Sequence, residues 1–250
     1  MQITYDLILV LVGMLVGFIN TLAGGGSSVL YPVLIFMGMP IHTAIGTSRV
    51  GFVAQGIFSV AGFKSKGVFI FPFNLYVALS AMAGGLIGAW ISLHTSPQNL
   101  QRILALIMLM IAVLILIQAK IKKGSGNMRI YGKWLIFSLI TYFFIGIYGG
   151  FIQAGMGFMI ILAGTLLNRM NLTQANSIKA LVVLIITLPT LYMFAVKGHV
   201  NWEAGLAIAI GTATGSWLTS RWSVNVNEKY IRIIIASIVV ILAIKLWFYQ

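Results

Sequence analysis

Two glycine-rich breaks in otherwise apolar sequence are the first features with the chemistry of a binding site. The first contains Gly24, Gly25, Gly26 and Ser27, and the second contains Gly155 and Gly157. Unwound backbone at membrane depth is tolerated only where it lines protein or a water-filled cavity. A helix that begins just after such a break directs free N–H groups and a partial positive charge into that cavity. No Gly-Lys-Ser/Thr follows either break, so the pattern favours an anion site over a nucleotide loop.

A basic residue follows each break at a similar place, one position away from an exact match between the two halves. Arg49 comes after Thr47-Ser48, and Lys179 comes soon after Asn176-Ser177. A cation within a membrane span costs at least a few kcal/mol, so it usually faces a polar interior. In one interpretation the two residues are fixed charges that attract an anion. In the other their long side chains snorkel to the lipid headgroups. The sequence leaves both interpretations open.

Amides and hydroxyls near the breaks could supply hydrogen bonds. Asn20 and Gln153 lie beside the two breaks, where an unpaired amide is costly, and we expect both to contact substrate. Gln55 is expected to join helices instead. The remaining candidate donors around the cations are Thr47, Ser48, Asn176 and Ser177. The three histidines, His42, His94 and His199, are expected to be solvated loop residues.

Acidic residues are nearly absent, which limits the substrate. The three acids, Asp6, Glu203 and Glu228, all lie at the ends of apolar runs. Proton relays and cation sites in transporters usually use interior acids. A metal or organic-cation substrate is therefore disfavoured, whereas sodium coupling through hydroxyls and carbonyls, or proton coupling, stays open. With no cysteine we expect no disulfide, no bound metal, no cofactor and no enzymatic activity.

The composition requires a bilayer to bury these residues. Of 250 residues, 60% are hydrophobic and 8% are charged, against about 25% charged in soluble domains. The net charge of +13 comes from basic residues that punctuate the apolar runs. That pattern is typical of cytoplasmic anchors rather than of a nucleic-acid surface. The sequence therefore predicts an all-α, multi-pass integral membrane protein whose first run is a retained span.

Eight apolar runs are long enough to be candidate spans. They are Leu7–Leu22, Ile45–Phe63, Phe73–Leu93, Ile103–Ala119, Trp134–Phe151, Ala180–Val196, Ala204–Leu218 and Ile231–Phe248. Val29–Met37 and Phe158–Leu167, one after each break, are too short to cross alone and either cross with help or re-enter. Four Gly-x-x-x-Gly pairs, beginning at Gly13, Gly84, Gly146 and Gly211, predict close helix crossings.

The chain is an internal duplication. From the breaks onward a constant offset of 131 residues pairs Gly24 with Gly155, Met39 with Met170 and Gly84 with Gly215. We expect a first repeat over residues 1–119, a basic linker over 120–133 and a second repeat over 134–250. If each half crosses an odd number of times, 11 loop cations share one side and three oppose them. The positive-inside rule then favours inverted repeats with a cytoplasmic linker.

The same residues resemble a known family. Ala23-Gly24-Gly25-Gly26-Ser27-Ser28, followed by His42-Thr43-Ala44-Ile45-Gly46-Thr47-Ser48, is similar to the sulfite exporter TauE/SafE family of permeases. A degenerate second copy, Gln153-Ala154-Gly155-Met156-Gly157 with Ala175-Asn176-Ser177, is similar to it too. The resemblance covers essentially the whole chain. It implies a bacterial inner-membrane permease for sulfite, sulfoacetate or another organosulfonate, with these motifs at its site.

The sequence thus predicts a secondary transporter that moves a small anion by alternating access between inverted halves with broken helices. Its expected partners are the anion, the lipid bilayer and a coupling ion, either a proton or sodium, with no nucleic acid. An anion channel is the main alternative, and an intramembrane enzyme is a weaker one.

Overall fold

The computed structural model describes residues 2–22, 24–65, 67–118, 128–222 and 228–248. Throughout these ranges the regular structure is helical, without a strand. The first half contains α1 (Gln2–Leu22), α2 (Ser27–Phe36), α3 (Ile41–Ser65), α4 (Phe73–His94) and α5 (Pro97–Gln118). The second contains α6 (Lys133–Phe151), α7 (Met156–Leu162), the π-helix η1 (Ala163–Leu167), α8 (Leu172–Val196), α9 (Trp202–Trp222) and α10 (Glu228–Phe248).

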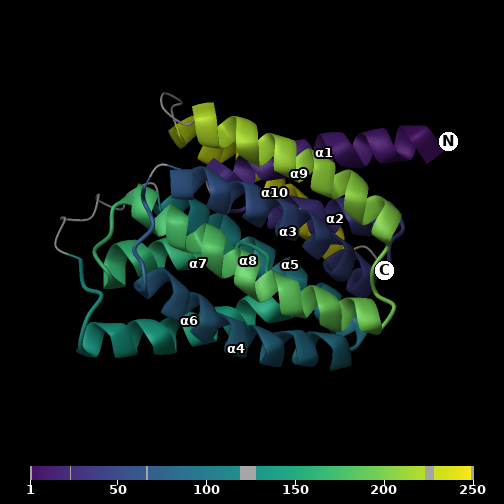
Figure 1. The fold of residues 1–250 in the computed structure, drawn as a ribbon. Helices are drawn as coiled ribbons and strands as arrows, with labels where there is room; N and C mark the ends of the chain where they lie inside the picture. Colours follow the sequence, from purple (N-terminus) through teal and green to yellow (C-terminus); the bar gives the residue numbers. More distant parts are fainter. Residues whose placement is uncertain (1, 23, 66, 119–127, 223–227, 249–250) are drawn as a thin grey trace.

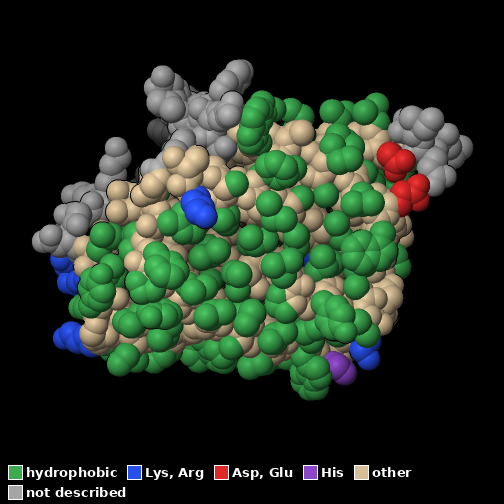
Figure 2. Space-filling model, viewed as in Figure 1, with side chains coloured by type: hydrophobic (Ala, Val, Ile, Leu, Met, Phe, Trp, Pro, Cys, Tyr) green, Lys and Arg blue, Asp and Glu red, His purple; other side chains and the backbone are tan. Residues whose placement is uncertain are grey.

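Helices occupy the predicted apolar runs as far as the described residues extend, so the helical membrane fold is confirmed. Among the described residues, α4, α6 and α8 are each long and apolar enough to cross a bilayer. Large apolar side chains point outward, including Phe144 at 63% and Tyr192 at 71% exposure. Figure 2 shows an apolar surface across one face, with charged side chains gathered mainly toward its two ends. An exposed apolar surface of this extent is suited to lipid.

The two halves pack crosswise. The first helix of each half lies against the fourth helix of the other, so α1 packs on α9 and α6 packs on α4. Figure 1 shows these two pairs along opposite edges of the molecule, with α3 and α8 between them. The central helices α3 and α8 contact each other, as do α5 and α10. This pairing follows the duplication in the sequence, while the inverted orientation of the halves stays a prediction.

Glycine permits both crosswise contacts. A Cβ atom on Gly13 would lie 2.7 Å from the carbonyl oxygen of Ile208, and one on Gly17 would lie 2.5 Å from that of Thr212. At the other crossing, a Cβ on Gly84 would overlap the backbone of Phe143. The predicted Gly-x-x-x-Gly crossings are therefore confirmed, and they join one half to the other.

Two central helices begin earlier than the apolar runs indicated. The predicted spans start at Ile45 and Ala180, whereas α3 starts at Ile41 and α8 at Leu172. A capping box fixes the start of α8: the Asn171 side chain accepts the N–H of Gln174 at 2.9 Å, and the Gln174 side chain accepts that of Asn171 at 3.0 Å. As a result, Arg49 and Lys179 lie two turns inside their helices.

The end of the basic linker meets the turn that precedes α8. The backbone N–H of Arg129 donates to the Asn168 carbonyl at 3.0 Å, and the Asn168 side chain donates to the Arg129 carbonyl at 2.9 Å. Arg169 follows directly, so these two arginines lie at the same end of the bundle, as the sidedness argument requires. Most of the predicted linker, residues 120–127 of 120–133, lies outside the described residues.

Candidate functional site

The two glycine breaks touch each other at the centre of the molecule. The Ser27 hydroxyl donates to the backbone carbonyl of Gln153 at 3.2 Å and accepts the N–H of Gly155 at 3.0 Å. Gly24, with a left-handed φ of +84°, packs so closely on Gly157 that an added Cβ would lie 2.9 Å from its carbonyl carbon. Gly25 and Gly26 are buried behind this contact. The breaks therefore form one contact region built from both halves.

Arg49 reaches from α3 into the break of the other half. Its Nη1 donates to the Thr190 hydroxyl at 2.6 Å and to Oε1 of Gln153 at 3.3 Å, and its Nη2 donates to the Gly150 carbonyl at 2.6 Å. The guanidinium also lies 4.7 Å from the centre of the Phe194 ring. Arg49 is 0% exposed, which excludes snorkelling. Each of these hydrogen-bond acceptors is neutral.

Lys179 makes the reciprocal contact from the second half. Its Nζ donates to the backbone carbonyl of Asn20 at 3.0 Å and to that of Thr21 at 3.4 Å, in the last turn of α1. The side chain is buried as well, at 6% exposure. Cations stabilise helix C-termini, where the last carbonyls lack helical partners. Each half thus places its interior cation at the end of the other half's first helix.

The side-chain amides of the two residues beside the breaks, Asn20 and Gln153, are also hydrogen-bonded. Nδ2 of Asn20 donates to Oε1 of Gln55 at 3.0 Å, and Nε2 of Gln153 donates to the Thr187 hydroxyl at 2.7 Å. Gln153 has a φ of +63°, which is unusual for a residue with a side chain. Two side-chain and three backbone hydrogen bonds hold it there. Asn20 and Gln153 both line the second pocket described below, and their contact with substrate stays a prediction.

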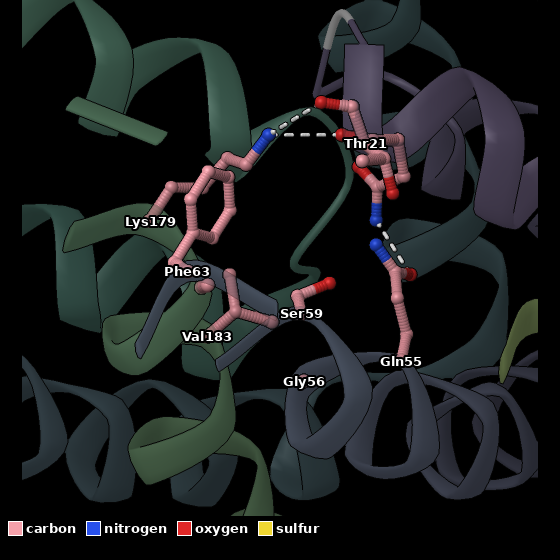
Figure 3. Close-up of a pocket in the computed structure, with 9 residues that line it drawn as sticks. Thr21, Gln55, Gly56, Ser59, Phe63, Lys179 and Val183 are labelled. Carbon is pink, nitrogen blue, oxygen red and sulfur yellow. Dashed lines mark hydrogen bonds between the residues drawn. The ribbon is translucent and has the colours of Figure 1, made fainter. Parts of the chain in front are cut away.

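Two small pockets lie in this region and share Asn20 and Val183. The first is lined by Asn20, Thr21, Gln55, Gly56, Ser59, Phe63, Lys179, Ala180 and Val183. Figure 3 shows Lys179 reaching across it toward Thr21. The second is lined by Asn20, Ser27, Phe52, Gln153, Met156, Gly157 and Val183. The first has about 20 Å³ in which the centre of a water-sized molecule fits, roughly enough for a single water.

Four predicted residues have no hydrogen bond to either break and, like Arg49, line neither pocket. The Thr47 hydroxyl accepts the N–H of Asn201 at 2.9 Å and fastens α3 to the α8–α9 loop. The Ser48 hydroxyl donates to its own helix, at Ile45, and the Ser177 hydroxyl donates to the carbonyl of Gln174, both at 2.8 Å. Asn176 is half-buried in the second turn of α8. A substrate role for these four stays a prediction.

Sequence reasoning missed polar residues that the fold brings to the centre. Gln55 was expected only to join helices, and it also lines the first pocket together with Ser59. Thr187 and Thr190 hold the side chains of Gln153 and Arg49. The available signal was their spacing, three residues apart on one face of an otherwise apolar helix.

The prediction for His42 was wrong. It lies in the first turn of α3 and is buried, with Nε2 3.1 Å from the Ser92 carbonyl oxygen. Its ring stacks on His199 of the α8–α9 loop, with 5.2 Å between ring centres. Burial lowers the pKa of His199 from its usual value, and the neighbouring His42 and Lys197 lower it further.

Comparisons with known proteins agree with this architecture. The family profile described as "Sulfite exporter TauE/SafE" matches residues 9–246. "Probable membrane transporter protein YfcA" of Escherichia coli (strain K12) is 28% identical over 240 residues, covering 96% of this chain and 88% of its own. A "Probable membrane transporter protein" of Haemophilus influenzae is 24% identical over 234 residues, covering 93% and 91%. No solved structure matches the chain.

The match extends over both halves and includes the two breaks and both interior cations. The chain therefore belongs to the TauE/SafE sulfite exporter family and is a membrane transporter.

Proposed function

We propose that this protein moves a small oxyanion or sulfonate, such as sulfite or an organosulfonate, by alternating access across the bacterial inner membrane. It would span that membrane many times as two inverted halves, with the anion bound between the breaks. Transporters built from repeats commonly bind substrate at broken helices near the midplane.

The observation that carries this proposal is the pair of buried cations. Arg49 and Lys179 come from opposite halves, and within the described part of the chain their hydrogen-bond acceptors are neutral oxygens. Neutral acceptors compensate a buried charge only in part, because taking the ion out of water is costly. An anion between the breaks would complete that compensation.

The remaining polar groups suit an oxyanion. The amides of Asn20 and Gln153 and the hydroxyl of Ser27 lie around the second pocket and can turn N–H or O–H donors toward sulfonate oxygens. Gly157 lets the backbone approach closely. The water-sized pockets suit a closed conformation, so the halves must separate to admit an anion.

Binding is tested first by thermal stabilisation of the purified protein in detergent. Sulfite, sulfoacetate, isethionate and sulfate are compared with acetate at matched ionic strength. A ligand at about 100 times its Kd adds roughly 2.7 kcal/mol to the native state. We expect a raised unfolding temperature with sulfite or a sulfonate and none with acetate. Equal shifts with every anion would contradict a dedicated site.

Transport is tested in proteoliposomes preloaded with unlabelled anion. A carrier accumulates labelled sulfite or isethionate transiently by counterflow, and its initial rate saturates with concentration. A channel only equilibrates the label. Flux without counterflow would therefore replace alternating access with an anion pore, and no flux of either anion would refute the proposed substrate class.

A further inference from the structure

The two interior cations are not chemically equivalent. Both hold carbonyls at the end of the opposite half's first helix, Arg49 at Gly150 and Lys179 at Asn20 and Thr21. A guanidinium stays charged at every physiological pH, whereas an ammonium can release a proton. The duplicated site therefore has one permanent charge and one that can be switched.

These same carbonyls are the groups that would bind sodium. In transporters with broken helices, half-helix C-terminal ends and unwound carbonyls coordinate the coupling Na⁺. Here the Lys179 ammonium already lies 3.0 Å from the Asn20 oxygen and 3.4 Å from the Thr21 oxygen. The Arg49 guanidinium lies 2.6 Å from the Gly150 oxygen at the matching helix end. Side-chain cations occupy both positions, which disfavours a sodium ion there.

We propose that Lys179 is the proton-coupling group of the transporter, and that one proton travels with each monovalent anion. This inference rests on the proposed function, because it requires an anion at the site between the breaks. The protonated ammonium favours anion binding, and loss of the anion favours release of the proton. The unloaded carrier then returns with a neutral Lys179.

The proton step needs no further reactant. One N–H bond of the ammonium breaks, the electron pair stays on Nζ, and the proton passes to a water in the first pocket. The space there, about 20 Å³, is enough for that water. The neutral amine keeps two N–H groups, so the contacts to Asn20 and Thr21 can persist in weakened form. Reprotonation from the other side reverses the step.

Among the described residues, no second titratable side chain lines this pocket. Lys179 is the only ionisable side chain among the residues that line it. Among the helices that pack next to α8, α3 carries Arg49, whose guanidinium is hydrogen-bonded to Gln153 at the second break. Helix α7 has no titratable residue. The others are tyrosines or lie near helix ends: Tyr5 and Asp6 on α1, His42 and Lys64 on α3, Tyr76 and His94 on α4, and Lys133, Tyr142 and Tyr148 on α6.

The test compares wild-type protein with Lys179→Arg, which keeps the charge and cannot release it. Proteoliposomes receive labelled isethionate, a monoanion whose charge does not change with pH. With the outside one pH unit more acidic, the wild type should accumulate it up to about tenfold, since one pH unit is about 1.36 kcal/mol. Lys179→Arg should retain counterflow but lose this accumulation. Lys197→Arg, at the exposed end of the same helix, is the matched control and should behave as wild type.

Several results would overturn the proposal. Proton-driven accumulation by Lys179→Arg equal to wild type would do so, as would accumulation driven by a sodium gradient at equal pH on both sides. Wild-type counterflow without any response to the pH gradient refutes the coupling alone. If neither sulfite nor isethionate shows counterflow, the proposed function fails first.

A second measurement needs only the wild type, in case Lys179→Arg does not fold. An inward isethionate gradient is applied to lightly buffered vesicles that contain a pH-sensitive dye. Proton symport acidifies the interior in proportion to the anion taken up. Anion uptake without a pH change overturns the proposal.

Discussion

Replacing Gly24 with alanine should destabilise the protein through the contact between the breaks, and Gly38 provides a matched control. Both glycines have left-handed φ angles, +84° and +87° respectively. A Cβ atom on Gly24 would lie 2.9 Å from the carbonyl carbon of Gly157, whereas one on Gly38 would meet nothing within 4 Å. The two substitutions share the backbone strain and differ in the contact.

The expected magnitudes follow from those two terms. A left-handed residue with a Cβ costs about 1–2 kcal/mol, and the reduced freedom of the unfolded chain returns about 0.4–1 kcal/mol of it. Gly38→Ala should therefore lower the free energy of unfolding by about 0–1.5 kcal/mol. Overpacking adds about 1–3 kcal/mol, so Gly24→Ala should cost that much more than Gly38→Ala.

Reversible unfolding in mixed detergent micelles measures both free energies under the same conditions. Equal losses for Gly24→Ala and Gly38→Ala would refute the contact between the breaks. A third variant, Gly157→Ala, sharpens the test, because its Cβ would lie 2.8 Å from the Gly24 oxygen. One separation of the breaks relieves both overlaps, so the double variant should cost less than the sum of the single ones.

Three further predictions concern the charges and their surroundings. Arg49→Gln should leave the protein folded and raise the Kd for isethionate at least tenfold, since a hydrogen bond to a charged group contributes about 1.5–3 kcal/mol; an unchanged Kd from calorimetric titration would make Arg49 a structural cation. Thr47→Val should cost about 0.5–1.5 kcal/mol of stability, because the N–H of Asn201 loses its acceptor, while a raised Kd would return Thr47 to the anion site. Because burial, and then the neighbouring His42, lower the pKa of His199 in the folded protein, stability present above the ordinary pKa of about 6.5 should be lost as the pH falls below it. The protection factors of amides in the α8–α9 loop should then be lower at pH 5 than at neutral pH, less so in His199→Gln, and equal protection factors at the two pH values would contradict the argument.

The fold was largely predictable because the bilayer imposes simple patterns. Runs of about 20 apolar residues are spans, and paired glycines four residues apart are crossings. The constant offset of 131 residues revealed the duplication. It could not reveal the crosswise pairing of α1 with α9, since apolar helices have no complementary charges that specify a partner.

The depth of the site residues was harder to predict. Hydropathy placed the starts of two spans at Ile45 and Ala180, because the turns before them are polar. Those turns are helical in the structure, which places His42 in a helix and both cations well inside the bundle. The choice between snorkelling and burial depended on where these helices begin, and a hydropathy window does not resolve that boundary.

Crosswise packing also constrains how the protein is made. During synthesis α1 enters the membrane long before α9 exists, because about 200 residues separate Gly13 from Gly211. At roughly 5–20 residues per second, the glycine face of α1 waits some 10–40 seconds for its partner. Helices α4 and α6 are close in the sequence and can pack together much sooner. The middle of the nascent chain is therefore packed while α1 still lacks its partner α9. In that interval the glycine face of α1 is exposed without the helix that covers it in the folded protein.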